Sequence, residues 1–274
     1  YLKNNIDSSY FNKSSHSKDR IKLNSFINNI LLSVDKNEDV FHSFRKNFDF
    51  NFKYSELIKF NKYKSIILIG MGGSALGAKA IYFFCKQKIK KNFIFFDNLD
   101  QLKIEKIKKN INLKNSLFII ISKSGNTLET LINSNLFKDK INNKNAIIIT
   151  EKKTNLLNTF AKNKKILVIE HKDYIGGRYS VLSEVGMIPA YFMGLKIKSF
   201  RKNLLSFFNS KEKNLFLNSI IKLSHIYKSK KINSIILLNY SPEINAFLYW
   251  CQQLIAESLG KKGKGLLPVI SPAP

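Results

Sequence analysis

The chain has 274 residues with a hydrophobic content of 44%, which suits about two globular domains and excludes both a disordered chain and a membrane-spanning protein. Its two cysteines, Cys85 and Cys251, lack the spacing of a disulfide scaffold or a zinc site, so we expect a reducing, cytoplasmic setting. The formal net charge of +27 suggests a nucleic-acid partner, but only four of the 46 basic residues are arginine and the lysines are scattered, so we expect no specific nucleic-acid partner.

The first part of the chain, residues 1–60, is predicted to form an N-terminal helical arm. It begins with a polar, serine-containing stretch, and apolar residues then recur at a helical spacing, at Ile21, Phe26, Ile27, Ile30 and Leu31. The stretch lacks the apolar segment of a signal peptide, and the chain begins with Tyr1 instead of Met. A fragment of a longer chain is one interpretation of this start.

From residue 64 onward, short apolar runs alternate with helical stretches, a pattern typical of a doubly wound parallel sheet. Strands buried on both faces are expected at residues 66–69, 93–96, 117–121, 146–149 and 166–169. Helices are expected near residues 75–86, 127–137 and 180–194. The predicted fold class is therefore α/β, a three-layer αβα arrangement whose first domain covers residues 61–195.

The rest of the chain predicts a second α/β unit that is not finished. A helical connection is expected over residues 196–230, followed by a sixth strand at 234–238 and a helix at 242–259. We assign residues 231–274 to the start of a truncated second domain.

A glycine-rich turn follows the first predicted strand, where open parallel sheets bind their ligands. Residues 70–75 read GMGGSA, and Asp97 follows the next strand, which fits a dinucleotide-binding pattern. The same glycines suit any ligand whose phosphate or sugar approaches a helix N-terminus. A NAD-dependent enzyme and a tight turn without a ligand are both alternatives at this point.

A second candidate ligand loop follows the third predicted strand, where residues 122–130 read SKSGNTLET. The hydroxyls of Ser122, Ser124 and Thr127 and the ammonium of Lys123 meet where a helix begins, which suits a phosphate monoester. Ordinary capping by Ser124 or Thr127 is the alternative, but it accounts for only one hydroxyl. We therefore predict that residues 122–127 form a phosphate loop.

Two later motifs complete a resemblance. Residues 176–183 read GGRYSVLS and residues 253–261 read QLIAESLGK. Together with the two loops, they resemble the motifs of the glucose-6-phosphate isomerase family in its shorter bacterial form, which is built from sugar-isomerase (SIS-type) domains. The match runs from about residue 65 to the end of the chain. The first two motifs occur in sugar-isomerase domains generally, whereas the last two are specific in this order and spacing.

The resemblance implies an aldose-ketose isomerase that interconverts glucose 6-phosphate and fructose 6-phosphate through a cis-enediol(ate), in glycolysis and gluconeogenesis. It implies a homodimer and no cofactor or metal. Its implied substrate and phosphate contacts are Gly73, Ser74, Ser122, Lys123, Ser124 and Thr127. Arg178 then stabilises the enediolate, and Glu257 moves the proton between C2 and C1. A sugar-phosphate sensor without catalysis is the alternative, but it leaves Arg178 and Glu257 without a task.

Glu257 also stands out physically, because it lies in the last turn of a helix that begins at residues 241–243 and stops at Gly260. The dipole there is unfavourable to a carboxylate and makes it a better base. In the family, a ring-opening histidine and a late lysine lie downstream of this helix, and no histidine here matches that position. Either the sequence is truncated, or those groups are absent and the chain turns over closed-ring substrate weakly or not at all.

Overall fold

A computed structural model describes residues 13–229 and 232–273 of the protein. Its larger sheet is wholly parallel, with strand order β2-β1-β3-β4-β5. The strands are β1 (Ser65–Ile69), β2 (Asn92–Phe96), β3 (Ser116–Ile121), β4 (Ala146–Thr150) and β5 (Leu167–Glu170). All five predicted strands are confirmed to within one residue at either end, and the α/β class is confirmed with them.

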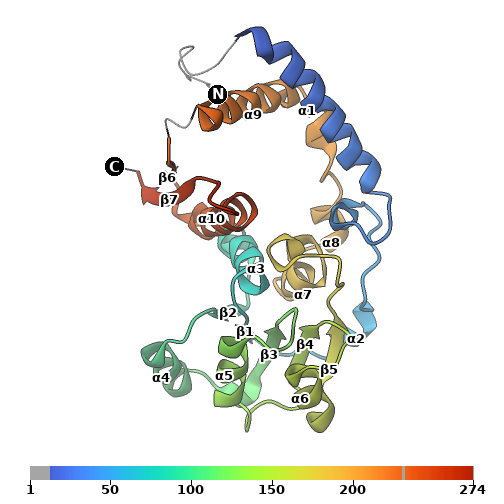
Figure 1. Ribbon diagram of the computed structural model, residues 1–274. Coiled ribbons are helices and arrows are strands. Elements are labelled where there is room, and N and C mark those ends of the chain that lie inside the picture. The colour runs from blue at the N-terminus through green and yellow to red at the C-terminus, as the bar shows by residue number, and fades with distance from the viewer. Residues whose placement is uncertain (1–12, 230–231, 274) are drawn as a thin grey trace.

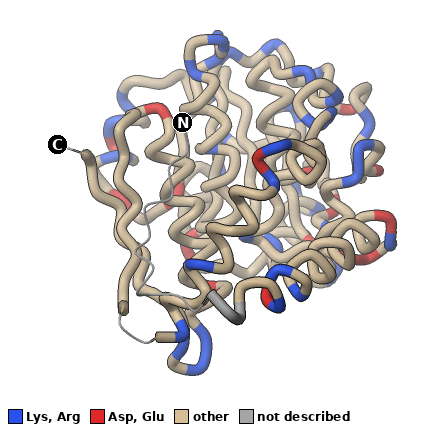
Figure 2. The backbone as a smooth tube through the Cα atoms, turned by 90° about the horizontal axis from the view of Figure 1, so that it is seen from above, with Lys and Arg blue, Asp and Glu red and all other residues tan. Residues whose placement is uncertain are grey.

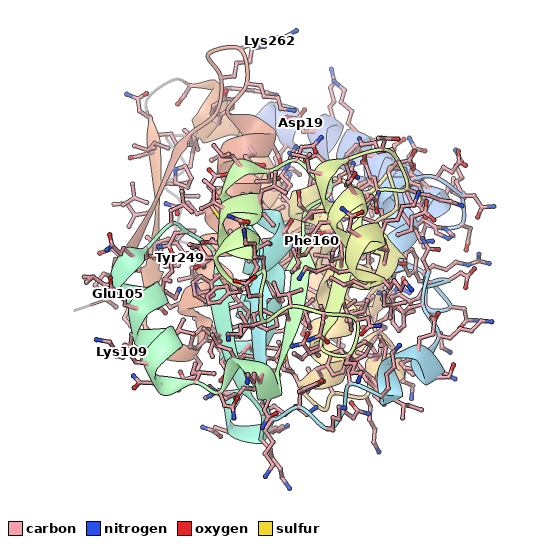
Figure 3. All side chains as sticks on the ribbon, turned by 90° about the horizontal axis from the view of Figure 1, so that it is seen from below. Asp19, Glu105, Lys109, Phe160, Tyr249 and Lys262 are labelled. Atoms are coloured by element: carbon pink, nitrogen blue, oxygen red, sulfur yellow. The ribbon has the colours of Figure 1, made fainter. Side chains whose placement is uncertain are left out.

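Helices cover both faces of this sheet, because alternate residues of each buried strand point to opposite sides. Ile66 and Leu68 of β1 join one core, which is closed by α2 (Tyr54–Ile58), α3 (Gly73–Phe84) and α7 (Glu184–Phe192). Ile67 and Ile69 join the other, which is closed by α4 (Gln101–Asn110), α5 (Leu128–Leu136) and α6 (Leu156–Lys164). In Figure 3, α4 and α6, marked by Glu105 and Phe160, lie on the side turned to the viewer.

Two of these helices, α4 and α6, were not among the predicted elements. Both are mostly polar and rich in lysine or asparagine, but their apolar residues do recur on one face. Each has an N-cap that the sequence does display, since Asp100 accepts from the Lys103 amide and Asn155 from the Asn158 amide.

A second, two-stranded parallel sheet consists of β6 (Ser234–Asn239) and β7 (Leu267–Pro272), joined through α10 (Asn245–Leu259). The sixth predicted strand and its following helix are thus confirmed. The helical connection differs in detail, because α8 (Ile197–Phe200) and a short 3₁₀ turn precede α9 (Glu212–Lys228), which begins later than expected. The four domain assignments stay predictions.

The described part of the N-terminal arm begins with α1 (Lys13–Ser33), which lies beside α9 (Figure 1), and a 3₁₀ turn at Val40–Phe44 and α2 follow after non-helical segments. Asp19 on α1 lies 2.7 Å from His225 on α9. Of the predicted apolar face, Ile27 is buried, but Ile21 and Phe26 remain exposed. The residues before α1 lie outside the described part of the chain.

Basic residues are distributed along the whole backbone and do not gather into one stripe (Figure 2). This matches the scattered lysines of the sequence. Within residues 13–229 and 232–273, none of the helices has the length and apolar character needed to cross a bilayer.

Arg201 ties the N-terminal arm to the first sheet layer from a buried position, with 2% of its surface exposed. Its guanidinium donates to the carbonyl oxygens of Leu182, Ser43 and Arg45. Burial lowers the pKa of this side chain to about 10. The group therefore stays charged at neutral pH while it links residues 43–45 of the N-terminal arm to Leu182.

Replacing Arg201 by methionine is expected to lower the free energy of unfolding by about 3 kcal/mol, because three enclosed carbonyl groups lose a charged donor. Urea unfolding of the two proteins measures this difference. The matched control is Arg45→Met, since the Arg45 side chain is 46% exposed and should contribute less than about 0.5 kcal/mol. Equal losses in the two variants would contradict a buried anchoring role for Arg201.

Candidate active site

The strand order creates a topological switch point between β1 and β3, because the chain leaves β1 toward β2 and leaves β3 toward β4. Crevices of this kind, at the carboxyl ends of the strands, are where open α/β sheets bind ligands. Both loops predicted from the sequence start here. A Cβ atom added to Gly70 would lie 3.0 Å from the carbonyl oxygen of Ile121, so the two loops lie side by side.

In the predicted phosphate loop, residues 122–127, hydroxyl groups face one another at the start of α5. The Ser122 Oγ lies 2.8 Å from the Thr127 Oγ1 and accepts a bond from the Gly125 amide at 3.2 Å. The Ser124 Oγ accepts from the Asn126 amide at 3.2 Å. Thr127 occupies the N-cap position without a side-chain capping bond. Simple capping by Thr127 therefore does not explain its hydroxyl.

Lys123 engages a different set of partners. Its ammonium donates to the carbonyl oxygen of Asp173 at 2.6 Å and lies 3.5 Å from the Glu151 carboxylate, which is buried. The side chain thus braces the phosphate loop against the segment that leads to Gly176. Its predicted role as a phosphate contact stays a prediction.

A second cluster forms where α10 reaches the turn at residues 176–178. The Arg178 Nη1 lies 3.4 Å from the Glu257 Oε2, and the Gln253 Nε2 donates to the Glu257 Oε1 at 2.8 Å. The Glu257 side chain is half exposed, so it is accessible to a ligand. The structure therefore brings together the two residues that the sequence assigned to catalysis.

The glycines after β1 let the turn at residues 176–178 and the Gln253 side chain come close to the start of α3. A Cβ on Gly73 would lie 2.5 Å from the Arg178 amide nitrogen and would overlap the carbonyl group of Gly177. Gly72 has a φ of +51°, and a Cβ there would lie 2.7 Å from the Gln253 Nε2. Ser74 follows in the first turn of α3. Close packing therefore requires glycine at positions 72 and 73, whether or not a ligand also approaches this turn.

The structure argues against the dinucleotide-binding alternative, because the carboxylate of Asp97 is already paired within the protein. The Asp97 carboxylate lies 2.5 Å from the Lys79 ammonium and 3.5 Å from that of Lys103. Both of its oxygens are thus engaged by lysines of the protein. A carboxylate held in this way is poorly placed to accept the hydroxyl groups of a ribose.

His171 precedes the turn at residues 176–178 but has a structural environment. Its side chain is buried, and its Nδ1 lies 2.9 Å from the Lys172 carbonyl oxygen. Burial lowers the pKa of this imidazole, which keeps it neutral at pH 7. A buried imidazole bonded to the backbone suits a structural role and not a catalytic one.

Several residues of the cluster received no role from the sequence. Gln253 precedes Glu257 by one helical turn, and this i, i+4 spacing was the available signal. The Trp250 Nε1 donates to the Arg178 carbonyl oxygen at 2.9 Å, and the hydroxyls of Ser258 and Tyr179 lie 2.7 Å apart. No sequence pattern announces these contacts, because they join segments that are distant in the chain.

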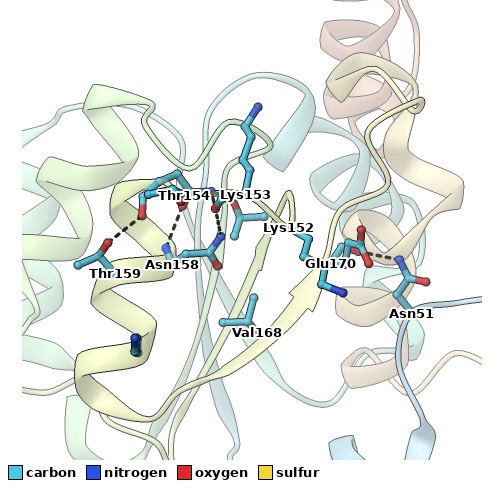
Figure 4. Close-up of a pocket in the computed structure, with 11 residues that line it drawn as sticks. Asn51, Lys152, Lys153, Thr154, Asn158, Thr159, Val168 and Glu170 are labelled. Atoms are coloured by element: carbon cyan, nitrogen blue, oxygen red, sulfur yellow. Dashed lines mark hydrogen bonds between the residues drawn. The ribbon is translucent and has the colours of Figure 1, made fainter.

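Beside the ends of β4 and β5 lies a separate hollow of about 850 Å³ (Figure 4). Many of its polar groups bond to one another. The Asn158 Nδ2 donates to the Lys153 carbonyl oxygen at 2.6 Å, and the Asn51 Nδ2 donates to that of Glu170 at 3.4 Å. Neither proposed catalytic residue lines it, so it is a weaker candidate than the cluster at Arg178.

Solved structures with the same architecture identify the class. A hypothetical protein from Thermus thermophilus superposes with a TM-score of 0.76 at 23% identity, covering 95% of this chain and 66% of that chain. A glucose-6-phosphate isomerase from Chlamydia trachomatis superposes with a TM-score of 0.63 at 24% identity, covering 80% and 47%. The fold is therefore α/β, of the sugar-isomerase type.

The family follows from sequence. The phosphoglucose isomerase family model matches residues 18–265, and the chain belongs to this family, which confirms the predicted resemblance. The glucose-6-phosphate isomerase of Methanocaldococcus jannaschii is 34% identical over 230 residues, which cover 80% of this chain and 55% of that protein. That of Acholeplasma laidlawii is 34% identical over 221 residues, covering 74% and 52%. The chain spans about half the length of the curated relatives it matches.

Proposed function

We propose that the protein interconverts glucose 6-phosphate and fructose 6-phosphate, in glycolysis and gluconeogenesis. The observation that carries this proposal is the contact between Arg178 and Glu257 above the Gly73 turn, on the same sheet edge as the phosphate loop. A carboxylate, a guanidinium and a phosphate-binding loop are what a proton transfer next to a sugar carbonyl requires. Membership of the phosphoglucose isomerase family supports the same activity.

In the proposed reaction, the hydroxyls of Ser122, Ser124 and Thr127 and the first amides of α5 hold the phosphate of the open-chain sugar. Lys123 adds positive charge behind them. The Gly73-Ser74 turn lies against the sugar. Together these contacts place C1 and C2 of the substrate at the cluster around Arg178.

The chemistry then needs one base and one cation. Glu257 takes the proton from C2, and the electrons of that C–H bond form the C1–C2 double bond while the C1 carbonyl oxygen becomes negative. Arg178 stabilises this enediolate. The C2 hydroxyl proton then moves to the C1 oxygen, and return of the abstracted proton to C1 with formation of the C2 carbonyl gives fructose 6-phosphate. The adjacent carbonyl makes the C2 proton acidic, so the step requires neither a metal nor a redox cofactor.

The test is a coupled assay on the protein encoded by the complete gene, in which fructose 6-phosphate is converted and the glucose 6-phosphate formed is oxidised with NADP. No turnover under conditions where the protein is folded would overturn the proposal. Exchange of the C2 hydrogen of glucose 6-phosphate with D₂O, followed by NMR, separates an isomerase from a sensor. A sensor binds the sugar phosphate but exchanges nothing.

We also propose that the protein works in the cytoplasm as a homodimer without a specific nucleic-acid partner. The family resemblance supports the dimer, and the two unpaired cysteines, Cys85 and Cys251, agree with a reducing compartment. Light scattering coupled to size exclusion tests the dimer, and a mass of one protomer at micromolar concentration would disprove it.

Removing the Ser122 hydroxyl is expected to weaken substrate binding. Ser122→Ala should raise the KM for fructose 6-phosphate about 10- to 100-fold, because a hydrogen bond to a charged group contributes about 1.5–3 kcal/mol. The coupled assay measures KM and kcat separately. Ser134→Ala is the matched control, since the Ser134 Oγ is buried nearby but donates to the Thr130 carbonyl oxygen of its own helix. A KM that stays at the wild-type value in Ser122→Ala would exclude the phosphate role.

A further inference from the structure

Ser258 follows the proposed base at the end of α10, and its hydroxyl faces another segment. A serine in a helix commonly bonds the carbonyl oxygen of its own preceding turn. The Ser258 Oγ lies 3.0 Å from the Arg178 Nε and 2.7 Å from the Tyr179 hydroxyl. The residue thus contacts the turn at residues 176–178 from the same helix end that carries Glu257.

The chemistry of these contacts fixes the donors. A guanidinium has no acceptor, so the Ser258 Oγ accepts from the Arg178 Nε–H, and the Ser258 O–H can donate to the Tyr179 oxygen. Burial alone would raise the pKa of Tyr179, but its hydrogen bonds to Ser258 and Arg178 lower it. The three side chains therefore form one connected chain of hydrogen bonds.

Arg178 is held at further points besides Nε. Its guanidinium carbon lies 4.7 Å from the centre of the Tyr179 ring, and the Trp250 indole fixes the backbone carbonyl. The Nη1 atom then reaches the Glu257 carboxylate. A guanidinium anchored through Nε presents its Nη groups in one direction, which an unanchored arginine on a glycine turn does not.

We propose that Ser258 is a positioning residue for the isomerisation: it anchors Arg178 through Nε and thereby aligns the guanidinium with the base on the same helix end. The inference rests on the proposed function. Glu257 and Ser258 are consecutive on α10, so the base and the anchor of the stabilising cation move together. Any shift of α10 against the turn at residues 176–178 moves both groups by the same amount.

Ser258→Ala is expected to lower kcat about tenfold, because the guanidinium loses its alignment in the transition state. The KM for fructose 6-phosphate should change less than about twofold, since the phosphate loop is a separate segment. Ser258→Thr keeps the hydroxyl and should restore most of kcat. Ser206→Ala, on an exposed 3₁₀ turn, is the control and should match the wild type. Wild-type kcat in Ser258→Ala, or a loss in Ser258→Thr as large as that in Ser258→Ala, would overturn the proposal.

A second measurement does not depend on turnover. The Nε–H resonance of Arg178 in a ¹H–¹⁵N spectrum, identified by its loss in Arg178→Lys, should shift in Ser258→Ala and remain in place in Ser206→Ala. An unmoved resonance would show that the anchor is absent. If the wild type exchanges no C2 hydrogen, the proposed function fails and the positioning role fails with it. If the wild type turns over and Ser258→Ala equals it, only the positioning role fails.

Discussion

Replacing Glu257 by glutamine is expected to lower kcat for fructose 6-phosphate by a factor of about 10² to 10⁴, because the amide keeps the shape of the side chain but cannot accept a proton. The bond from Gln253 is compatible with this change, since an amide oxygen accepts it as well as a carboxylate does. The KM should therefore stay within about threefold of the wild type. Both the coupled assay and C2 hydrogen exchange should report the loss.

The control for this variant is Glu243→Gln, which makes the same change near the beginning of the same segment. Glu243 is exposed and accepts a bond from the Ser241 hydroxyl at 2.6 Å, far along the helix from Arg178. Its replacement should leave kcat unchanged. Turnover at the wild-type rate in Glu257→Gln would remove the base assignment while leaving phosphate binding by residues 122–127 intact.

Replacing Gly73 by alanine is expected to have the second largest effect, a loss of about 10² in kcat/KM, because a displacement near 1 Å at a catalytic group has consequences of this size. The new methyl group would overlap the Gly177 carbonyl, and backbone atoms cannot rotate away as a side chain can. The turn at residues 176–178 must then move away from α3, and Arg178 moves with it.

The free energy of unfolding of this variant should fall by about 1–3 kcal/mol, the usual effect of overpacking. Gly177→Ala is the matched control for stability, since a Cβ on Gly177 would have no atom within 4 Å. Urea unfolding of Gly73→Ala and Gly177→Ala compares the loss of stability at the two glycines that face each other between α3 and the turn at residues 176–178. Equal midpoints would mean that α3 and the turn at residues 176–178 have room between them.

The sheet was predictable because its strands are buried on both faces, which makes each strand a short continuous apolar run such as residues 117–121. The positions of the two ligand loops followed from the same pattern, since strand ends mark where the chain can bind a ligand. The helices α4 and α6 were not predicted because they are short and mostly polar, although each has an apolar face and an N-cap residue in the sequence.

The proposed catalytic cluster around Arg178 and Glu257 was predictable only in part. Arg178 and Glu257 were found through motifs, and Gln253 could have been found from its i, i+4 spacing to Glu257, whereas Tyr179 and Ser258 meet only through the packing of α10 against the turn at residues 176–178. The direction of the Lys123 side chain also depends on a distant carboxylate, that of Glu151. Such contacts follow from tertiary structure and leave no periodic signal in the sequence.

The packing of α10 against α3 also has a consequence for biosynthesis. Residues 65–170 complete the five-stranded sheet and its phosphate loop, and α10 is made later. Because domains fold as the chain emerges from the ribosome, we expect the nascent chain to form the sheet edge with the proposed phosphate loop first. The proposed base, Glu257, and its neighbour Ser258 are made together, after α9 and β6. If the proposed function holds, translation separates the formation of the proposed phosphate loop from the arrival of the proposed base.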